Sequence, residues 1–323
     1  MAHGEAISDK STLSRSVRGL SVPRTIDGDW PRHRNPSHNA RRSSTMLSSL
    51  CTVLIWTLCG CGSGSLNQNA GPLTHTANRG FVVFDGTLYA GKPNLTSYGL
   101  TPLTSLYAST LWSNGSDQSN PPNPSAVKAI LQQASASAPT TFLDIENWPL
   151  DGGQSAVADS VQKYVITLQS FEQFAPSLEF GYYGVAPEAD YWDAICAPDS
   201  SQYKAWQRRN DSVTPIAKQA NVLFPSIYTF YADENGWKTY AIAQIEEARR
   251  IAPGKPVYAF LWPRYQLDGA IGDYLAPDYW RMELETARQY ADGLVIWGGY
   301  QETWDNNAPW WLETESFLKE NGN

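Results

Sequence analysis

The sequence predicts an α/β fold, a distorted (β/α) TIM-like barrel of about seven parallel strands. Three observations predict it. The chain has 323 residues, which suits one large barrel of roughly 250 residues plus extra segments. From about residue 79 onward, short apolar runs alternate with longer helical patterns, as expected for parallel βα units. Six or seven such units in about 240 residues favour a closed barrel over an open sheet.

Each predicted strand is a short run of β-branched, aromatic or other apolar residues that is bounded by Gly, Pro or Asp. Such runs are typical of strands that are buried on both faces. The six runs are 81–84 (FVVF), 141–146 (TFLDIE), 178–183 (LEFGYY), 222–228 (VLFPSIY), 256–262 (PVYAFLW) and 293–297 (GLVIW). Residues 106–112 are a candidate for a seventh strand.

Four segments between these runs have helical patterns. Residues 126–134 follow Pro124-Ser125, a plausible start, and residues 156–174 repeat apolar residues close to the 3.6 period. In residues 242–251 the apolar residues form one stripe, and Pro253-Gly254 is expected to end that helix. Residues 279–290 form the fourth pattern, which ends near Asp292-Gly293.

The composition excludes several classes of protein. Apolar residues make up 42% of the chain and charged residues 17%, and 13 Trp with 17 Tyr indicate a substantial folded core. The formal net charge of −8 argues against a dedicated nucleic-acid binder, which normally carries a basic patch. Four Cys are too few for a disulfide scaffold, and no Cys pair has zinc-site spacing, so no metal site is predicted. The sequence has no glycine-rich phosphate-binding motif, so it does not indicate a nucleotide-binding enzyme, and no cofactor is expected.

The charges divide the chain into two parts. Residues 1–61 hold eight basic and four acidic residues, a net +4, which leaves 16 basic and 28 acidic residues, a net −12, for the rest. Within the first part, Arg41-Arg42 precede an apolar run at 46–61 (MLSSLCTVLIWTLCGC), which is too short to span a bilayer but has the length of a signal-peptide core.

The end of that run, Leu58-Cys59-Gly60-Cys61, resembles a bacterial lipobox, in which a Cys is lipidated and becomes the new N-terminus. We therefore expect residues 1–45 to be a leader or a mis-assigned start, 46–61 a lipoprotein signal peptide, 62–77 a flexible tether and 78–323 the catalytic barrel. Lipidation of Cys61 would anchor the protein in a bacterial cell envelope, facing the periplasm or exterior. The alternative is a short buried helix. If Cys61 is lipidated, Cys196 is the lone thiol of the barrel, and it is expected to be a small buried residue.

The predicted strand 141–146 ends with two acids, Asp144 and Glu146. Residues i and i+2 of a strand point to the same side, so both acidic side chains should face the same opening of the barrel. That opening lies at the C-terminal ends of the strands, where enzymes with a barrel fold have their active sites. Two acids so close cannot both ionise freely, so one is held protonated as a general acid must be. Glu146, nearer the opening, is the predicted proton donor, and Asp144 should stay charged. The alternative is a pair of ordinary loop or helix-capping acids.

Five ordered blocks over about 220 residues resemble the hyaluronidase family of glycoside hydrolases. They are FLDIENWP (142–149), GYYGVAP (181–187), LFPSIY (223–228), PVYAFLWPRY (256–265) and DGLVIWGG (292–299), and the short Tyr98-Gly99-Leu100 also occupies a family position. The resemblance implies a distorted barrel of about seven strands. It also implies retaining, substrate-assisted cleavage of N-acetylhexosaminide bonds, in which the 2-acetamido oxygen of the sugar attacks the anomeric carbon.

By position, the resemblance makes Glu146 the proton donor and Asp144 the residue that holds the acetamido nitrogen. Tyr228 resembles the tyrosine that hydrogen-bonds the acetamido group. Other implied sugar contacts come from Tyr183 and Trp297, and weaker candidates for the groove walls are Trp148, Trp262, Tyr265 and Trp304.

The sequence departs from the family in three respects. Cys61 and Cys196 cannot supply the usual disulfides, and Trp148-Pro149 lacks the Arg that the family has between these residues. The net −12 does not suit the polyanion hyaluronan, for which cations are expected. We therefore predict a monomeric, hyaluronidase-like endo-β-N-acetylhexosaminidase that acts on a polysaccharide or glycosaminoglycan-like glycan, with a neutral or mixed glycan at least as suitable as hyaluronan. The alternative is a catalytically silent carbohydrate-binding barrel on the cell surface.

Overall fold

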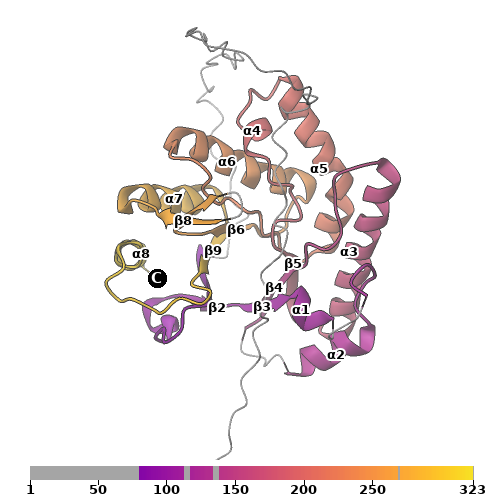
Figure 1. Cartoon of the computed structure of the whole chain (residues 1–323), viewed down its shortest axis with the longest axis horizontal. Coiled ribbons are helices and arrows are strands. Elements are labelled where there is room, and N and C mark those ends of the chain that lie inside the picture. Colours follow the sequence, from indigo (N-terminus) through magenta and orange to yellow (C-terminus); the bar gives the residue numbers. More distant parts are fainter. Residues whose placement is uncertain (1–79, 113–116, 134–137, 268–269, 323) are drawn as a thin grey trace, which may run out of the picture.

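The structure is a computed structural model that describes residues 80–112, 117–133, 138–267 and 270–322 (Figure 1). The predicted leader, signal peptide and tether, with the lipidation site Cys61, lie outside the described residues, so these assignments stay predictions. Within the described part of the chain, no helix is both long and apolar enough to cross a membrane.

Parallel strands form the centre of the fold. They are β1 (Val82–Thr87), β2 (Thr101–Pro102), β3 (Thr104–Tyr107), β4 (Thr140–Asp144), β5 (Glu179–Tyr182), β6 (Tyr258–Leu261) and β9 (Gly293–Gly298). An antiparallel hairpin of β7 (Arg264–Leu267) and β8 (Ala270–Tyr274) follows β6 directly. The hairpin was not predicted.

The parallel strands form two ladders, β2-β1-β9-β6 and β3-β4-β5. Residues 222–229 lie between them, because isolated parallel bridges join Phe224 to the end of β5 and Ser226 to β6. The predicted strand at 222–228 is therefore present as bridges and not as a regular strand. Pro225 contributes to this interruption, since proline has no backbone N–H to donate to a ladder.

The row of strands therefore runs β3-β4-β5, then residues 222–229, then β6-β9-β1-β2. The two ends of the row are neighbours in the chain, because only Leu103 separates β2 from β3. The ladders of the described residues do not include one that joins β3 to β1. The parallel α/β class that the sequence predicted is confirmed.

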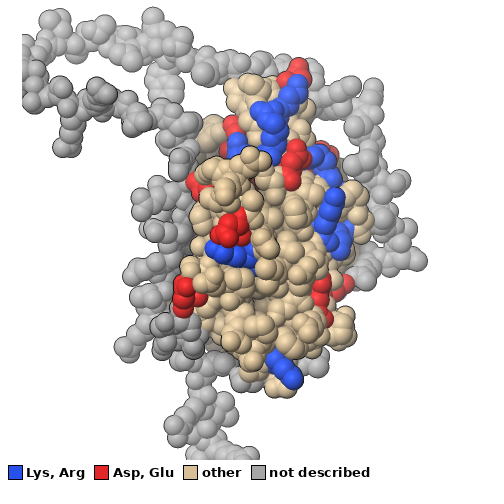
Figure 2. Space-filling view, turned by 90° about the vertical axis from the view of Figure 1, so that its right-hand side faces the viewer, with Lys and Arg blue, Asp and Glu red and all other residues tan. Residues whose placement is uncertain are grey.

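Helices lie around the strands (Figure 1), and acidic and basic side chains are interspersed on the face that Figure 2 shows. They are η1 (Leu95–Tyr98), α1 (Ala108–Leu111), α2 (Pro124–Gln133), α3 (Gln154–Phe174), α4 (Tyr191–Ala194), α5 (Ser201–Gln219), α6 (Glu234–Ile251), α7 (Pro277–Tyr290) and α8 (Pro309–Glu320). The four predicted helices correspond to α2, α3, α6 and α7, and α6 ends at Ile251 ahead of Pro253-Gly254, as predicted. The predicted strand at 106–112 is wrong beyond Tyr107, where α1 begins.

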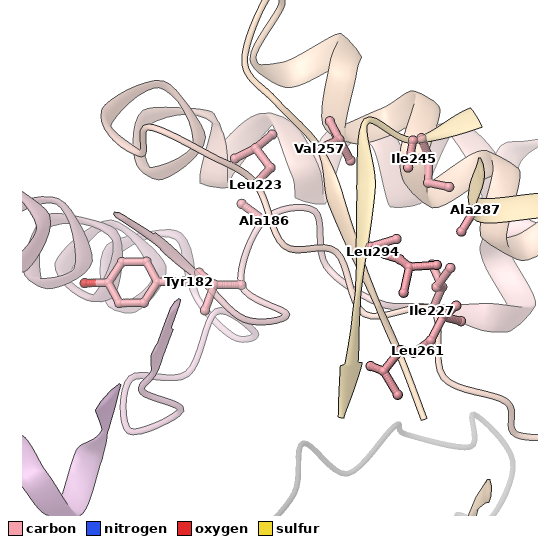
Figure 3. Close-up of a cluster of buried hydrophobic side chains, with 14 of the residues drawn as sticks. Tyr182, Ala186, Leu223, Ile227, Ile245, Val257, Leu261, Ala287 and Leu294 are labelled. Atoms are coloured by element: carbon pink, nitrogen blue, oxygen red, sulfur yellow. The ribbon is translucent and has the colours of Figure 1, made fainter. Parts of the chain in front are cut away.

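The strands bury both faces, in alternation. On one side, Leu223, Val257 and Leu294 pack in a large cluster with helix residues such as Ile245 and Ala287 (Figure 3). The next residues along the strands point to the opposite side. There they form a second, separate cluster, which we call the inner cluster: Phe84, Phe142, Tyr183, Val222, Phe224, Tyr228, Tyr258, Phe260, Trp262, Val295 and Trp297, with Val82, Leu103 and Tyr107 packed against it. Each buried side chain of this size contributes roughly 1.5–3 kcal/mol through removal from water.

Candidate active site

The two acids lie at the carboxyl end of β4. Asp144 is the last residue of the strand and is half-buried, and Glu146, two residues further on, is exposed. Ile145 between them is fully buried in the large cluster beneath the helices. The alternation that places Ile145 in the core directs both acids away from it. Glu146 is thus open to solvent, while Asp144 is half-buried.

The protein raises the pKa of both carboxyls. Burial raises the pKa of Asp144 to about 6. Burial first, and then the negative charge of Asp144, raise the pKa of Glu146 to about 8. The Glu146 side chain is exposed, so its desolvation comes from the protein atoms crowded around it and not from closure against solvent. With these raised pKa values, Glu146 is mostly protonated and Asp144 mostly ionised near pH 7. General acid catalysis needs one protonated and one ionised carboxyl.

Three of the predicted sugar-contacting residues converge in the inner cluster. Tyr183 follows β5, Tyr228 belongs to residues 222–229, and Trp297 lies in β9. The Tyr228 ring lies 5.7 Å from that of Tyr183 and 6.1 Å from that of Trp297, and it is nearly parallel to the indole, at 29°. Burial is the first cause that raises the pKa of each phenol, and the charge of Asp144 is among the further causes. Both tyrosines therefore lie within electrostatic reach of Asp144.

Two residues that the sequence did not single out also belong to this site. Tyr107 ends β3 directly opposite Asp144 in the parallel register, and its hydroxyl accepts a 3.5 Å hydrogen bond from Nε1 of Trp297. Burial raises its pKa to about 12, with smaller effects of Trp297 and Asp144. Ser226 Oγ lies 3.3 Å from the hydroxyl of Tyr183. A correct end for β3 would have revealed Tyr107, because strand ends in a parallel row share one edge.

Of the weaker candidates for the groove walls, Trp262 lies at the site and Tyr265 does not. Trp262 joins the site, since its ring lies 5.2 Å from Trp297 and 5.8 Å from Tyr228. Tyr265 lies in β7, where its ring packs edge-on against Tyr279 at 6.4 Å, outside the inner cluster.

Two of the predicted tryptophans, Trp148 and Trp304, lie outside the inner cluster. Trp148 is buried between Trp112 and Tyr164, with ring distances of 5.8 and 4.9 Å, and its indole N–H donates to the backbone oxygen of Gln118. Trp304 packs 4.8 Å from Trp311, beside α8. The structure does not bring either of them to the inner cluster.

The described residues contain no group of three or more His, Cys, Asp or Glu side chains that could hold a metal ion. All four histidines of the chain precede residue 80, so histidine cannot serve as the acid or base in residues 80–323. Carboxyl and phenol groups are thus the titratable groups at this site. A protonated, solvent-accessible carboxyl beside an ionised one, next to an aromatic wall, can donate a proton to a bound leaving group and stabilise the positive charge that develops.

Neither a family model nor a curated protein matches this chain. Solved structures do. The fold resembles that of bee venom hyaluronidase with a TM-score of 0.52 at 17% identity, over 74% of this chain and 97% of that chain. The structure of bee venom hyaluronidase in complex with a hyaluronic acid tetramer gives a TM-score of 0.50 at 15% identity, over 75% and 96%. At these identities the likeness shows the fold alone. The chain therefore has a fold like that of bee venom hyaluronidase, in agreement with the fold that the sequence motifs implied.

Proposed function

We propose that this protein is a glycoside hydrolase, a hyaluronidase-like endo-β-N-acetylhexosaminidase that uses Glu146 as its proton donor. One observation carries the proposal. An exposed carboxyl with a pKa of about 8 stands two residues beyond a deeper carboxyl with a pKa of about 6, at the carboxyl end of a parallel strand. The fold shared with bee venom hyaluronidase supports it. We further propose that the strand row closes into a distorted barrel around the inner cluster, since seven segments contribute to that cluster.

The proposed reaction is retaining and substrate-assisted. The acetamido oxygen of the sugar attacks the anomeric carbon as the glycosidic bond breaks, and Glu146 transfers its proton to the leaving oxygen. Ionised Asp144 holds the acetamido N–H and stabilises the positive charge that develops on the acetamido group. Water then attacks the anomeric carbon, the bond between that carbon and the acetamido oxygen breaks to restore the acetamido group, and Glu146 takes one proton from the water. Neighbours two positions apart on one strand are poorly placed to lie on opposite sides of the bond, which favours assistance by the substrate over a protein nucleophile.

The aromatic residues of the inner cluster suit the acetamido group. Tyr228 offers a hydroxyl for the acetamido oxygen, and Trp297 offers an apolar face for the acetamido methyl. Tyr183, beside Tyr228, is positioned to contact the same sugar. These roles follow from the family resemblance together with the ring positions.

The charges near the strand ends favour a neutral or mixed glycan. Two cations follow the ends of β1 and β6, and both are already paired. Lys92 lies 2.7 Å from Asp85, and Arg264 lies 2.8 Å from Glu302 and stacks on Tyr274. Cations that already form ion pairs within the protein contribute little to the binding of a polyanion. We propose an N-acetylated polysaccharide, with the enzyme acting as a monomer tethered through Cys61 to a bacterial cell envelope.

The test is Glu146→Gln. This substitution keeps the shape of the side chain and removes the proton, so hydrolysis of chitin, chondroitin, hyaluronan and peptidoglycan fragments should fall to background while binding of the same fragments persists. The matched control is Glu179→Gln at the start of β5, the opposite end of the parallel strands, which should keep full activity. Unchanged turnover in Glu146→Gln would refute the assignment. A wild-type protein that binds these glycans and cleaves none of them would favour the silent carbohydrate-binding barrel.

A further inference from the structure

Two aromatic side chains stand exposed next to each other outside the candidate active site. Trp192 in α4 is 57% exposed and Tyr231 is 42% exposed, and they are among the large hydrophobic side chains that the fold leaves open. Their ring centroids lie 5.1 Å apart, with 49° between the ring planes. We call this pair the aromatic platform. Two neighbouring aromatic rings left in water cost free energy unless a ligand covers them.

The platform lies on the side of the fold that holds the acid pair. Trp192 follows the end of β5, nine residues after Tyr183, and Tyr231 comes three residues after Tyr228. Both residues therefore belong to the loops that leave the carboxyl ends of two neighbouring strand segments. In parallel α/β folds these loops surround the ligand site.

Electrostatic contacts connect the platform to the loop that carries Glu146. Glu188, in the segment before α4, is close enough to Asp151 for the negative charge of Asp151 to contribute to raising its pKa, after burial as the first cause. Asp151 comes five residues after Glu146 in the loop beyond β4. β4 and β5 are neighbouring strands, and the ring contact between Trp192 and Tyr231 joins the segment after β5 to the segment after residues 222–229. We infer that one extended chain could contact all three segments.

The platform is held firmly from below. Tyr191 is buried, and its ring lies 5.2 Å from Trp192 and 4.9 Å from Tyr231. The hydroxyl of Tyr279 donates a 3.1 Å hydrogen bond to the backbone oxygen of Tyr231. Rings that are fixed before binding lose little conformational freedom on binding, which favours affinity.

The surroundings of the platform are acidic. Arg209 contacts three carboxylates, Glu188 at 3.1 Å, Asp190 at 2.6 Å and Asp193 at 3.1 Å, so its charge is more than compensated. Carboxylates accept hydrogen bonds from hydroxyl groups but repel anions. The platform therefore suits an uncharged, hydroxyl-rich ligand with an apolar face, which describes a pyranose ring.

We propose that Trp192 and Tyr231 form a distal sugar subsite, in which the rings stack on a pyranose of an uncharged N-acetylated glycan chain whose reacting bond lies at Glu146. The proposal rests on the proposed glycosidase function and adds the substrate class: a chain of several neutral sugars. A protein partner fits less well, because stable interfaces bury about 1,200–2,000 Å² and two side chains among paired charges offer far less apolar area.

The experiment measures binding and turnover separately, with defined oligosaccharides. Binding of the N-acetylglucosamine hexamer and dimer is measured by calorimetry in the Glu146→Gln protein, with and without Trp192→Ala. Turnover of the hexamer is compared in the wild type, Trp192→Ala and Tyr231→Ala. Leu312→Ala on α8 is the control, since Leu312 is 49% exposed and α8 lies away from α4 (Figure 1). A hyaluronan hexamer is the anionic probe.

We expect Trp192→Ala to weaken hexamer binding about 10-fold and to raise its KM to a similar extent, with kcat and dimer binding unchanged. Tyr231→Ala should act in the same direction and Leu312→Ala should have no effect. Hexamer binding that is insensitive to Trp192→Ala overturns the subsite, even if hydrolysis depends on Glu146. Equal or tighter Trp192-dependent binding of the hyaluronan hexamer overturns the neutral substrate class. Binding that depends on Trp192 without any Glu146-dependent hydrolysis supports the subsite and refutes the proposed function instead.

Discussion

Removal of the charge on Asp144 should lower the pKa of Glu146. Asp144 is the last residue of β4 and Glu146 lies two residues beyond it, and an extended backbone separates residues two positions apart by about 6.6 Å. A unit charge at that distance contributes about 2.5 kcal/mol at an effective dielectric constant of about 20, and about 1.3 kcal/mol at about 40, which the exposure of Glu146 makes more appropriate. At 1.36 kcal/mol per pKa unit, Asp144→Asn should lower the pKa of Glu146 by about 1 to 2, from about 8.

The assay is ¹³C NMR titration of the side-chain carboxyl carbons in protein labelled at glutamate, with Glu146→Gln used to assign the signal. It reads the pKa directly, so it does not depend on residual activity in Asp144→Asn. In the wild type, kcat/KM should decrease above about pH 8 as Glu146 loses its proton, and below about pH 6 as Asp144 becomes protonated. Asp151→Asn, an exposed acid in the same loop, is the control and should leave the pKa of Glu146 in place. A Glu146 pKa that does not fall in Asp144→Asn would show that the two carboxyls are not coupled.

Three further predictions concern other parts of the molecule. Tyr228→Phe keeps the ring packing but removes the hydroxyl, so kcat should fall about 10- to 100-fold with little change in thermal stability; an unchanged kcat would exclude the proposed contact. Glu283 is fully buried, accepts a hydrogen bond from Thr229, and its pKa is raised well above the ordinary value by burial. The contribution of Glu283 to the free energy of unfolding should therefore be most favourable below about pH 4.5 and decrease as pH rises toward its folded-state pKa, by at most about 1.4 kcal/mol per pH unit. Glu283→Gln should remove this part of the pH dependence, which thermal unfolding between pH 5 and 8 measures. Cys61→Ser should release the protein from the membrane fraction of cells; retention there would contradict the lipid anchor.

The positions of most strands could be predicted from the sequence because buried parallel strands are nearly continuous apolar runs with clear boundaries. The errors arose where the local pattern was ambiguous. At 106–112 an apolar run continues from β3 into α1, and periodicity cannot separate a short buried strand from a short helix. The placement of Tyr107 beside Asp144 was missed for this reason.

The sequence did not decide which aromatic residues belong together. Tyr182 and Tyr183 are adjacent and chemically identical. The hydroxyl of Tyr182 donates a hydrogen bond to the backbone oxygen of Tyr164 within the large cluster, whereas Tyr183 belongs to the inner cluster. Trp148, two residues after Glu146, packs beneath α3, whereas Trp297, far along the chain, contacts Tyr107. Burial alone does not distinguish these environments, since all of these side chains are buried or nearly so.

The sequence by itself determined the parallel α/β class and the presence of two acids on one side of a strand end, because strand alternation and apolar runs are local properties. Only the tertiary structure decided how far Glu146 and Asp144 are exposed, and that Tyr107 packs against the inner cluster while Trp148 and Trp304 lie outside it. It also placed Trp192 and Tyr231 together on the surface. Exposure, pKa and ring contacts depend on the packing of segments distant in the chain, and no local pattern specifies that packing.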